Sequence, residues 1–214
     1  NICPERLNSI TNYECFKGMI SAFNSDNLFE IESSLTRLFS SQPWALYTGK
    51  RMLNFVDNHD VIRAYTALKE KRNLLNLYTL LFTMPGIPCV YYGSEFGAEG
   101  DKSDLDYKLR PYIGDIDKTA HPELVERIRL LAKIRKGSRA LSYGTYKKAT
   151  VMNRNFSFVR EAEGERIIVA VNIEDHDCTI RVEEAEGTDL LTGQVRNLND
   201  IYLPPFTACI YRKN

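Results

Sequence analysis

The sequence Phe55-Val56-Asp57-Asn58-His59-Asp60 is the most informative part of this chain, because it places a histidine beside a carboxylate where a short apolar strand ends in a loop. The strand is predicted over Met52 to Val56, and the polar residues follow it directly. Barrels of alternating strands and helices carry their catalytic residues at this end of their strands. The stretch therefore predicts one edge of an active site.

A second segment repeats this arrangement further along the chain. Residues Leu74 to Met84 are apolar on nearly every side and predict a helix that other elements cover. This helix leads into Pro85-Gly86-Ile87-Pro88-Cys89-Val90-Tyr91-Tyr92-Gly93-Ser94-Glu95, which has the pattern of a buried parallel strand that ends in glycine and a carboxylate. Two such units in succession favour an α/β barrel over an isolated polar loop.

The two segments together resemble the α-amylase family of glycoside hydrolases (family 13), in which a seventh barrel strand ends in Asn-His-Asp and an eighth reads roughly Gly-x-Pro-x-x-Tyr-Tyr-Gly-x-Glu. Leu7 to Tyr13 resembles the sixth strand of such a barrel. The similarity is greatest to the neopullulanase and cyclomaltodextrinase-like branch, judged from Asn12-Tyr13-Glu14-Cys15-Phe16 and Gly100-Asp101-Lys102.

The resemblance implies an α/β fold in two parts. Residues 1–140 are expected to form the C-terminal part of a (β/α)8 TIM barrel, strands 6 to 8, and residues 141–214 an all-β C-terminal sandwich domain. Pro122 and Gly137 mark the two ends of a helix before the boundary. Short β segments follow it, over Tyr146 to Met152, Phe156 to Val159, Ile167 to Val171, Cys178 to Val182 and Thr207 to Tyr211.

The family's two other catalytic carboxylates have no counterpart in this sequence. By resemblance, the nucleophilic Asp and the general-acid Glu end the fourth and fifth strands, which precede the region like Leu7 to Tyr13. A full barrel takes about 250 residues, whereas the barrel-like part here covers residues 1–140. We therefore expect the chain to be the C-terminal portion of a larger retaining enzyme that acts on α-1,4-glucans, and to be inactive by itself.

The resemblance assigns a role to each residue of the Asn-His-Asp motif. Asp60 would stabilise the transition state by gripping two hydroxyls of the sugar that is cleaved. His59 would donate to a neighbouring hydroxyl, and Asn58 would shape the turn that aims both side chains. The alternative for Asp60 is a helix N-cap ahead of Ile62 to Leu68.

The polar loop after the second strand offers further candidates for substrate binding. Asp106 and Arg110 have the spacing of an Asp and an Arg that hold the next glucose in related amylases, and the alternative is a solvated surface pair. Glu95 is expected to pair with a buried arginine more than to line the pocket. Trp44 is expected to be a packing anchor more than a sugar-stacking platform, and Arg63 either turns toward the Asp60 loop or lies on a surface helix.

Composition limits the other classes of partner. Lys plus Arg and Asp plus Glu are equal at 28 each, so no nucleic-acid partner is predicted. No apolar run is long enough to predict a membrane span, and three histidines without ligand spacing predict no metal site. No cofactor is expected, although calcium is possible in the larger enzyme. Five scattered cysteines favour free thiols, and the compartment stays open with a cytoplasmic location favoured.

Two further hypotheses remain at this point. A non-catalytic carbohydrate-binding or scaffold protein with an amylase-like barrel is the alternative to an enzyme, and the retained Asn58, His59 and Asp60 argue against it. Strands six and eight of a partial barrel would also have bare edges, which invite pairing with another chain. We therefore expect self-association, or pairing with the other half of the barrel.

Overall fold

Three short parallel segments lie side by side in the first part of the chain. This computed structural model describes residues 2–3, 5–102, 106–182 and 184–214, apart from the side chain of Asp106. Strand β1 (Leu53–Asn54) pairs in parallel with β2 (Ile87–Pro88), and Thr11 forms a parallel bridge to Leu53. The segment at Thr11, β1 and β2 therefore occur in space in the order in which they occur along the chain.

These segments are shorter than the sequence predicts. The expected strand over Leu7 to Tyr13 is reduced to two isolated bridges, from Leu7 to Ile2 and from Thr11 to Leu53. It stops at Thr11 because the Asn12 side chain accepts the N–H of Cys15 at 3.0 Å and helix α1 (Tyr13–Asn24) begins at once. The expected strand over Met52 to Val56 is reduced to the two residues of β1.

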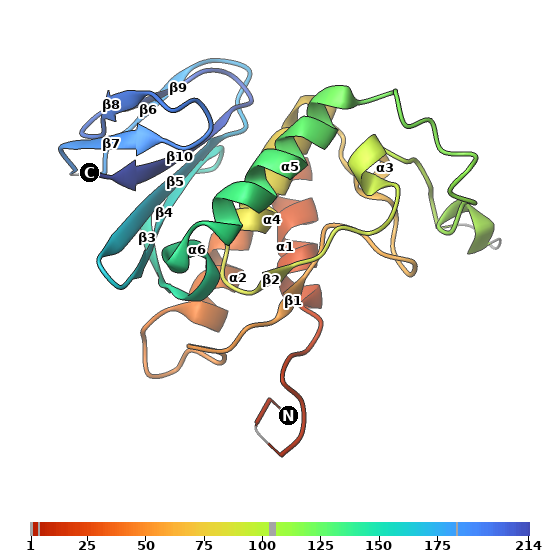
Figure 1. Ribbon diagram of the computed structural model, residues 1–214, viewed down its shortest axis with the longest axis horizontal. Coiled ribbons are helices and arrows are strands. Elements are labelled where there is room, and N and C mark those ends of the chain that lie inside the picture. The colour runs from red at the N-terminus through yellow and green to blue at the C-terminus, as the bar shows by residue number, and fades with distance from the viewer. Residues whose placement is uncertain (1, 4, 103–105, 183) are drawn as a thin grey trace.

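Helices connect and cover the parallel segments, as Figure 1 shows. The apolar helix predicted over Leu74 to Met84 is confirmed as α4 (Leu74–Thr83), in which every residue except Leu75 is buried. The helix predicted between Pro122 and Gly137 is confirmed as α5 (Pro122–Lys136). The remaining helical elements are α2 (Phe29–Phe39), α3 (Ala64–Ala67), η1 (Lys71–Asn73), η2 (Ser94–Phe96), η3 (Asp106–Lys108) and α6 (Arg139–Tyr143).

The last third of the chain forms two antiparallel sheets. The larger has six strands in the order β3-β4-β5-β10-β7-β8, and the smaller pairs β6 with β9. All five predicted β segments are present, whereas β7, β8 and β9 were not predicted because they are short and lack an extended alternating pattern. The strands are β3 (Thr145–Val151), β4 (Asn155–Ala162), β5 (Glu165–Asn172), β6 (Cys178–Ile180), β7 (Glu186–Asp189), β8 (Val195–Asn197), β9 (Ile201–Leu203) and β10 (Ala208–Lys213).

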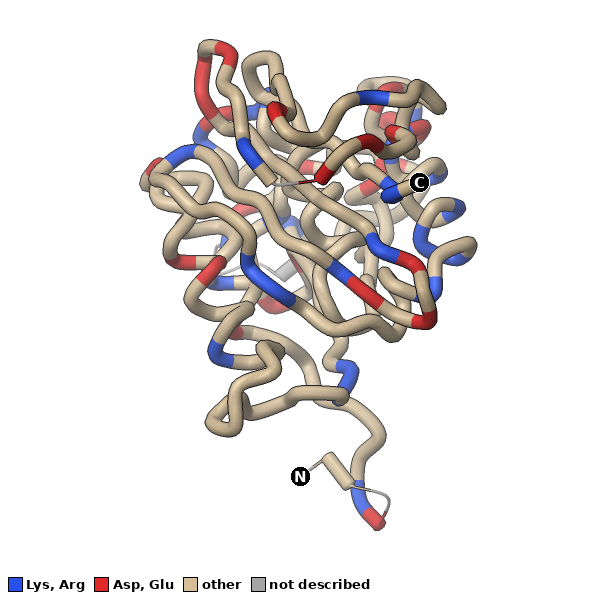
Figure 2. The backbone as a smooth tube through the Cα atoms, turned by 90° about the vertical axis from the view of Figure 1, so that its left-hand side faces the viewer, with Lys and Arg blue, Asp and Glu red and all other residues tan. Residues whose placement is uncertain are grey.

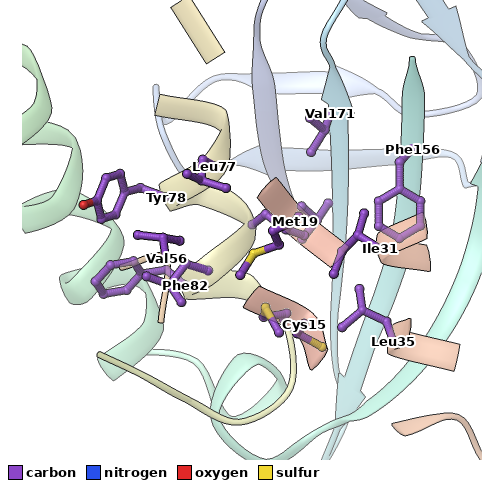
Figure 3. Close-up of a cluster of buried hydrophobic side chains, with 14 of the residues drawn as sticks. Cys15, Met19, Ile31, Leu35, Val56, Leu77, Tyr78, Phe82, Phe156 and Val171 are labelled. Atoms are coloured by element: carbon purple, nitrogen blue, oxygen red, sulfur yellow. The ribbon is translucent and has the colours of Figure 1, made fainter. Parts of the chain in front are cut away.

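One apolar core joins the helices to the larger sheet. Figure 3 shows Met19 and Ile31 from the first two helices, Leu77 from α4, and Phe156 and Val171 from the sheet in a single cluster of buried side chains. A second cluster, which includes Ile168, Ile201 and Leu203, lies between the two sheets. The first core is continuous across residue 141, so the domain boundary there stays a prediction.

Charged residues of both signs are spread along the chain. Figure 2 shows Lys and Arg interspersed with Asp and Glu along the backbone, in keeping with equal numbers of the two kinds. Among the described residues, no helix combines the length and the apolar content needed to cross a membrane. All five cysteines are free, and Cys15 and Cys209 are the buried ones.

Candidate active site

Buried amides tie the three parallel segments together at their centre. The Asn54 side chain donates to the carbonyl oxygen of Pro85 at 2.7 Å and accepts from the Asn12 side chain at 2.8 Å. Both asparagine side chains are completely buried. These bonds fix the register of the three segments, which is their alignment along the strand direction. They therefore also fix where each segment ends. Asn54 was not predicted from the sequence, although a polar residue within an apolar strand is a usable signal.

Asp57 is the first polar residue after β1, and it points into the protein. Its carboxylate accepts the N–H of Ala64 at 2.8 Å and the hydroxyl of Ser94 at 2.7 Å. Burial raises the pKa of Asp57, and the Ala64 N–H and Arg63 oppose that rise. Asp57 therefore holds the start of α3 and links it to η2. No role was predicted for Asp57 from the sequence.

Arg63 is completely buried beneath the two loops. Its guanidinium lies 3.6 Å from the Asp57 carboxylate, donates to the carbonyl oxygen of Tyr92 at 2.5 Å, and lies 4.5 Å from the centre of the Tyr91 ring. The backbone N–H of Arg63 donates to Gly100 O at 3.0 Å. The surface-helix alternative for Arg63 is thus wrong, because its side chain turns inward and joins the loops that follow β1 and β2.

The Asn-His-Asp motif lies on the surface above this buried pair. Asn58 Oδ1 accepts the N–H of Asp60 at 2.8 Å, which forms a tight turn, and Asn58 Nδ2 donates to the Tyr13 hydroxyl at 3.3 Å. His59 Nε2 lies 3.3 Å from the Asp60 carboxylate, and their side chains are 53% and 54% exposed. The helix N-cap alternative for Asp60 is wrong, because the helix begins at Ala64 and Asp57 accepts its N–H.

Arg110 approaches Asp60 from the loop after β2. Its Nη2 lies 3.7 Å from Asp60 Oδ1, and the Arg110 side chain is 39% exposed. Asp106 begins η3, but its side chain lies outside the described residues, so its expected role in holding the next glucose with Arg110 stays a prediction. The structure brings together four of the five predicted site residues: Asn58, His59, Asp60 and Arg110.

A wide hollow of about 820 Å³ adjoins this group of side chains. Gly100, Asp101 and Arg110 line it, and two exposed tyrosines, Tyr107 and Tyr112, stand at its side. Flat aromatic faces beside carboxylate and guanidinium groups can stack on a sugar ring and bond to its hydroxyls. The hollow can therefore accept a polar, ring-shaped ligand next to Asp60.

Two other candidates differ from expectation. Glu95 has a buried carboxylate oxygen, Oε2, without a hydrogen-bond partner, and no arginine of the described segments forms an ion pair with it. The expected arginine partner is therefore absent among those residues. Trp44 is 55% exposed, so its expected role as a packing anchor is wrong.

Several known proteins are similar in sequence to this chain. Residues 5–166 match the model of the alpha amylase catalytic domain. Alpha-amylase 2 of Dictyoglomus thermophilum is 30% identical over 167 residues, which cover 74% of this chain and 28% of the relative. Cyclomaltodextrinase of Thermoanaerobacter pseudethanolicus is 32% identical over 165 residues, which cover 75% of this chain and 28% of the relative. The chain thus spans less than a third of the length of these relatives.

Solved structures show the same relationship in three dimensions. A maltogenic amylase from S. marinus superposes with a TM-score of 0.80 at 25% identity, over 100% of this chain and 30% of that one. An α-amylase from Anoxybacillus shares the fold, with a TM-score of 0.76 over 96% of this chain and 47% of that one, at 23% identity. The matched model covers well over half of the residues, and the chain therefore belongs to the α-amylase family.

Proposed function

We propose that this chain supplies the transition-state-stabilising carboxylate, Asp60, to a retaining glycoside hydrolase that acts on α-1,4-glucans. The observation that carries the proposal is the position of Asp60, which is exposed after the end of β1 and flanked by His59 at 3.3 Å and Arg110 at 3.7 Å. A carboxylate held in this way accepts hydrogen bonds from sugar hydroxyls, and such bonds strengthen as positive charge develops on the ring.

The neighbouring residues take supporting roles in this proposal. His59 donates to a hydroxyl of the same sugar, and Asn58 holds the turn through the N–H of Asp60. Arg110, with Asp106 from the same loop, binds the next glucose. The relatives' names, amylase and cyclomaltodextrinase, support maltooligosaccharides, cyclodextrins and starch-derived dextrins as the substrate class.

The nucleophile and the acid/base residue belong, in this proposal, to sequence outside these 214 residues. The chain covers only 28% of the length of the two relatives, which leaves room for both groups elsewhere in such a protein. A retaining mechanism needs both carboxylates to flank the bond that breaks. The isolated chain is therefore expected to be inactive while the complete enzyme is active.

The exposed apolar side chains of the parallel segments support the same arrangement. Leu53 and Ile87 are 36% and 40% exposed although they lie in paired strands, and β2 has no second strand partner in the described ranges. Such an edge binds another strand. We expect it to pair with the rest of a barrel, or with a second copy when that part is missing. Light scattering after size exclusion tests this, and a monomer at every concentration contradicts it.

Hydrolysis of maltoheptaose and β-cyclodextrin tests the function. The assay compares the chain alone with the enzyme that includes the preceding barrel strands, and both with Asp60→Asn. Asp26→Asn is the matched control, because Asp26 is an exposed carboxylate paired with Arg154 away from the site. The proposal is supported if only the longer enzyme is active, and if that activity is lost in Asp60→Asn and kept in Asp26→Asn. Turnover by the chain alone shows that another carboxylate is the nucleophile.

The same assay separates the enzyme from a non-catalytic scaffold. Glucan binding without hydrolysis in the longer protein would favour the scaffold. The reducing-end anomer released from maltoheptaose gives a second readout, because a retaining enzyme releases the α-anomer from an α-linked substrate.

A further inference from the structure

A small cavity of about 190 Å³ lies at the opposite end of the parallel strands from Asp60. Lys50 and Arg51, which precede β1, line it together with Gly86, which lies just before β2. Ser142 to Tyr146 and Arg160 close it from the side of the β sheets. The cavity is thus a junction between the parallel segments and the sheet region, away from the candidate active site.

The lining of this cavity is strongly cationic. Lys50, Arg51 and Arg160 contribute three positive charges, and no Asp or Glu is among the described residues that line it. No described carboxylate lies within 4.0 Å of these three groups or of the adjacent Arg135. The whole chain carries equal numbers of the two charges, so this local excess does not follow from the overall composition.

Two of the arginines are buried and bonded only to backbone oxygens. Arg160 donates to Thr83 O at 2.7 Å and to Gly144 O at 2.9 Å, and it is 1% exposed. Arg135 donates to Phe82 O at 2.6 Å and also reaches Gly86 O. These carbonyls include the last ones of α4, whose helix dipole favours positive charge there. Neutral acceptors offset only part of the cost of burying two cations.

The positive groups also repel one another. Burial, followed by repulsion from Arg135, lowers the pKa of Arg160 to about 9. Burial, followed by repulsion from Arg51, lowers the pKa of Arg135 to about 10. The three guanidinium groups therefore act on one another across the cavity wall, and an anion placed between them would relieve this repulsion.

We propose that this cavity binds a small oxyanion of the phosphate class. Arg51 and Lys50 are exposed at its mouth and can close over the anion, while Arg160 faces it from the wall. The hydroxyls of Thr48 and Ser142 add donors that suit tetrahedral oxygens. A bound oxyanion would bridge the start of the parallel strands to the β region. It would stabilise the folded state by an amount that grows with the logarithm of the anion concentration above its Kd.

Thermal unfolding of the full chain in sodium phosphate tests the proposal. The control is sodium chloride at the same ionic strength, because general screening acts equally in both. In phosphate only, we expect Tm to rise with the logarithm of the anion concentration once that concentration exceeds Kd. Glucose 6-phosphate forms a separate arm: an equal rise places a phosphate monoester in the cavity, and no rise assigns the cavity to the free anion. Identical Tm curves in phosphate and in chloride overturn the proposal.

Two arginines provide a matched pair of variants. Arg51 and Arg139 both lie 4.9 Å from the centre of the Tyr143 ring, but only Arg51 lines the cavity, whereas Arg139 pairs with Glu163. Arg51→Gln should abolish the phosphate-dependent rise in Tm, and Arg139→Gln should retain it. A response that survives in Arg51→Gln contradicts the site.

A charge reversal gives an independent readout. Arg51→Glu places a carboxylate at the mouth of the cavity, so it should raise Tm without phosphate and remove the phosphate response. Asp60→Asn should keep the full response, because Asp60 lies at the other end of the strands. The result is therefore separate from the outcome of the hydrolysis assay. A lower Tm in Arg51→Glu, together with a retained response, would show that no anion binds there.

Discussion

Asp57 and Arg63 form an ion pair of 3.6 Å between Oδ2 and Nε, with side chains only 1% and 0% exposed. Arg63 also donates to the carbonyl oxygens of Tyr92 and Leu109, which belong to the chain that follows β2. The pair therefore connects the loop that carries Asp60 with the loop that carries Arg110. The surface arrangement of the candidate active site depends on this buried contact.

Asp57→Asn should strongly destabilise the protein. The substitution keeps the shape of the side chain but leaves the Arg63 charge buried without its partner, and such a loss costs about 3–5 kcal/mol. Urea unfolding followed by circular dichroism measures the change in the free energy of unfolding. Asp26→Asn is the control, since its exposed pair with Arg154 contributes about 1 kcal/mol or less. Equal changes in the free energy of unfolding for the two substitutions would show that the buried pair stabilises the fold no more than the exposed pair does.

Asn58→Ala should reduce catalysis by loosening the turn that holds Asp60. The substitution removes the acceptor of the Asp60 N–H, a bond worth about 1 kcal/mol, so kcat/KM of the active enzyme should fall roughly fivefold to tenfold. Asn58→Asp keeps an oxygen acceptor and should retain most of the activity. Asn197→Ala removes the same kind of turn in the β region and should leave kcat/KM unchanged. Full activity in Asn58→Ala would contradict the role of this turn.

Gly86→Ala should be far more destabilising than Gly49→Ala. Both glycines have positive φ, at 118° and 74°, which costs an alanine about 1–2 kcal/mol. A Cβ at Gly86 would also lie 2.6 Å from Met52 O and closer still to the Asn54 side chain, whereas one at Gly49 meets nothing within 4 Å. Tm measurements on the two variants test the difference, and similar shifts would rule out the crowding at Gly86.

Cys15 should make the fold sensitive to alkaline pH. Burial raises the pKa of its thiol to about 12, from 9.0 for an exposed thiol, so the folded state keeps a proton that the unfolded state releases. This contribution to stability is complete below pH 9 and is lost as the pH rises toward 12, at about 1.4 kcal/mol per pH unit. Cys15→Ala removes that slope.

Urea unfolding between pH 8 and pH 11 compares Cys15→Ala with the unmodified chain. The stability difference between the two should be constant below pH 9 and should shrink above it. Alanine also leaves a cavity, but that cost does not depend on pH. A difference that stays constant up to pH 11 would show that Cys15 ionises as readily in the folded state as in the unfolded one.

Local patterns predicted the elements that have strong local signals. The helix over Leu74 to Met84 is apolar on nearly all sides, and α5 begins at a first-turn proline and ends before Gly137. The strand β5 contains the apolar run Ile167 to Val171, and β4 contains β-forming aromatic and branched residues between turn signals, and both were also predicted. The two-residue lengths of β1 and β2 were not predicted. A strand ends where its backbone stops pairing with the next strand, and this depends on the neighbouring segment as well as on the residues of the strand itself.

The sequence alone determined that a polar Asn-His-Asp turn follows an apolar strand, and that Arg110 lies in a later loop. Only the tertiary structure decided that Asp57 points inward to Arg63 while Asp60 stays exposed. Both are aspartates in one short polar segment, and the local sequence does not indicate which of the two is buried. It also placed Arg160 against Thr83, 77 positions away, and Arg51 beside them. Periodicity reports which face of an element is apolar, whereas the meeting of distant charges depends on how whole elements pack.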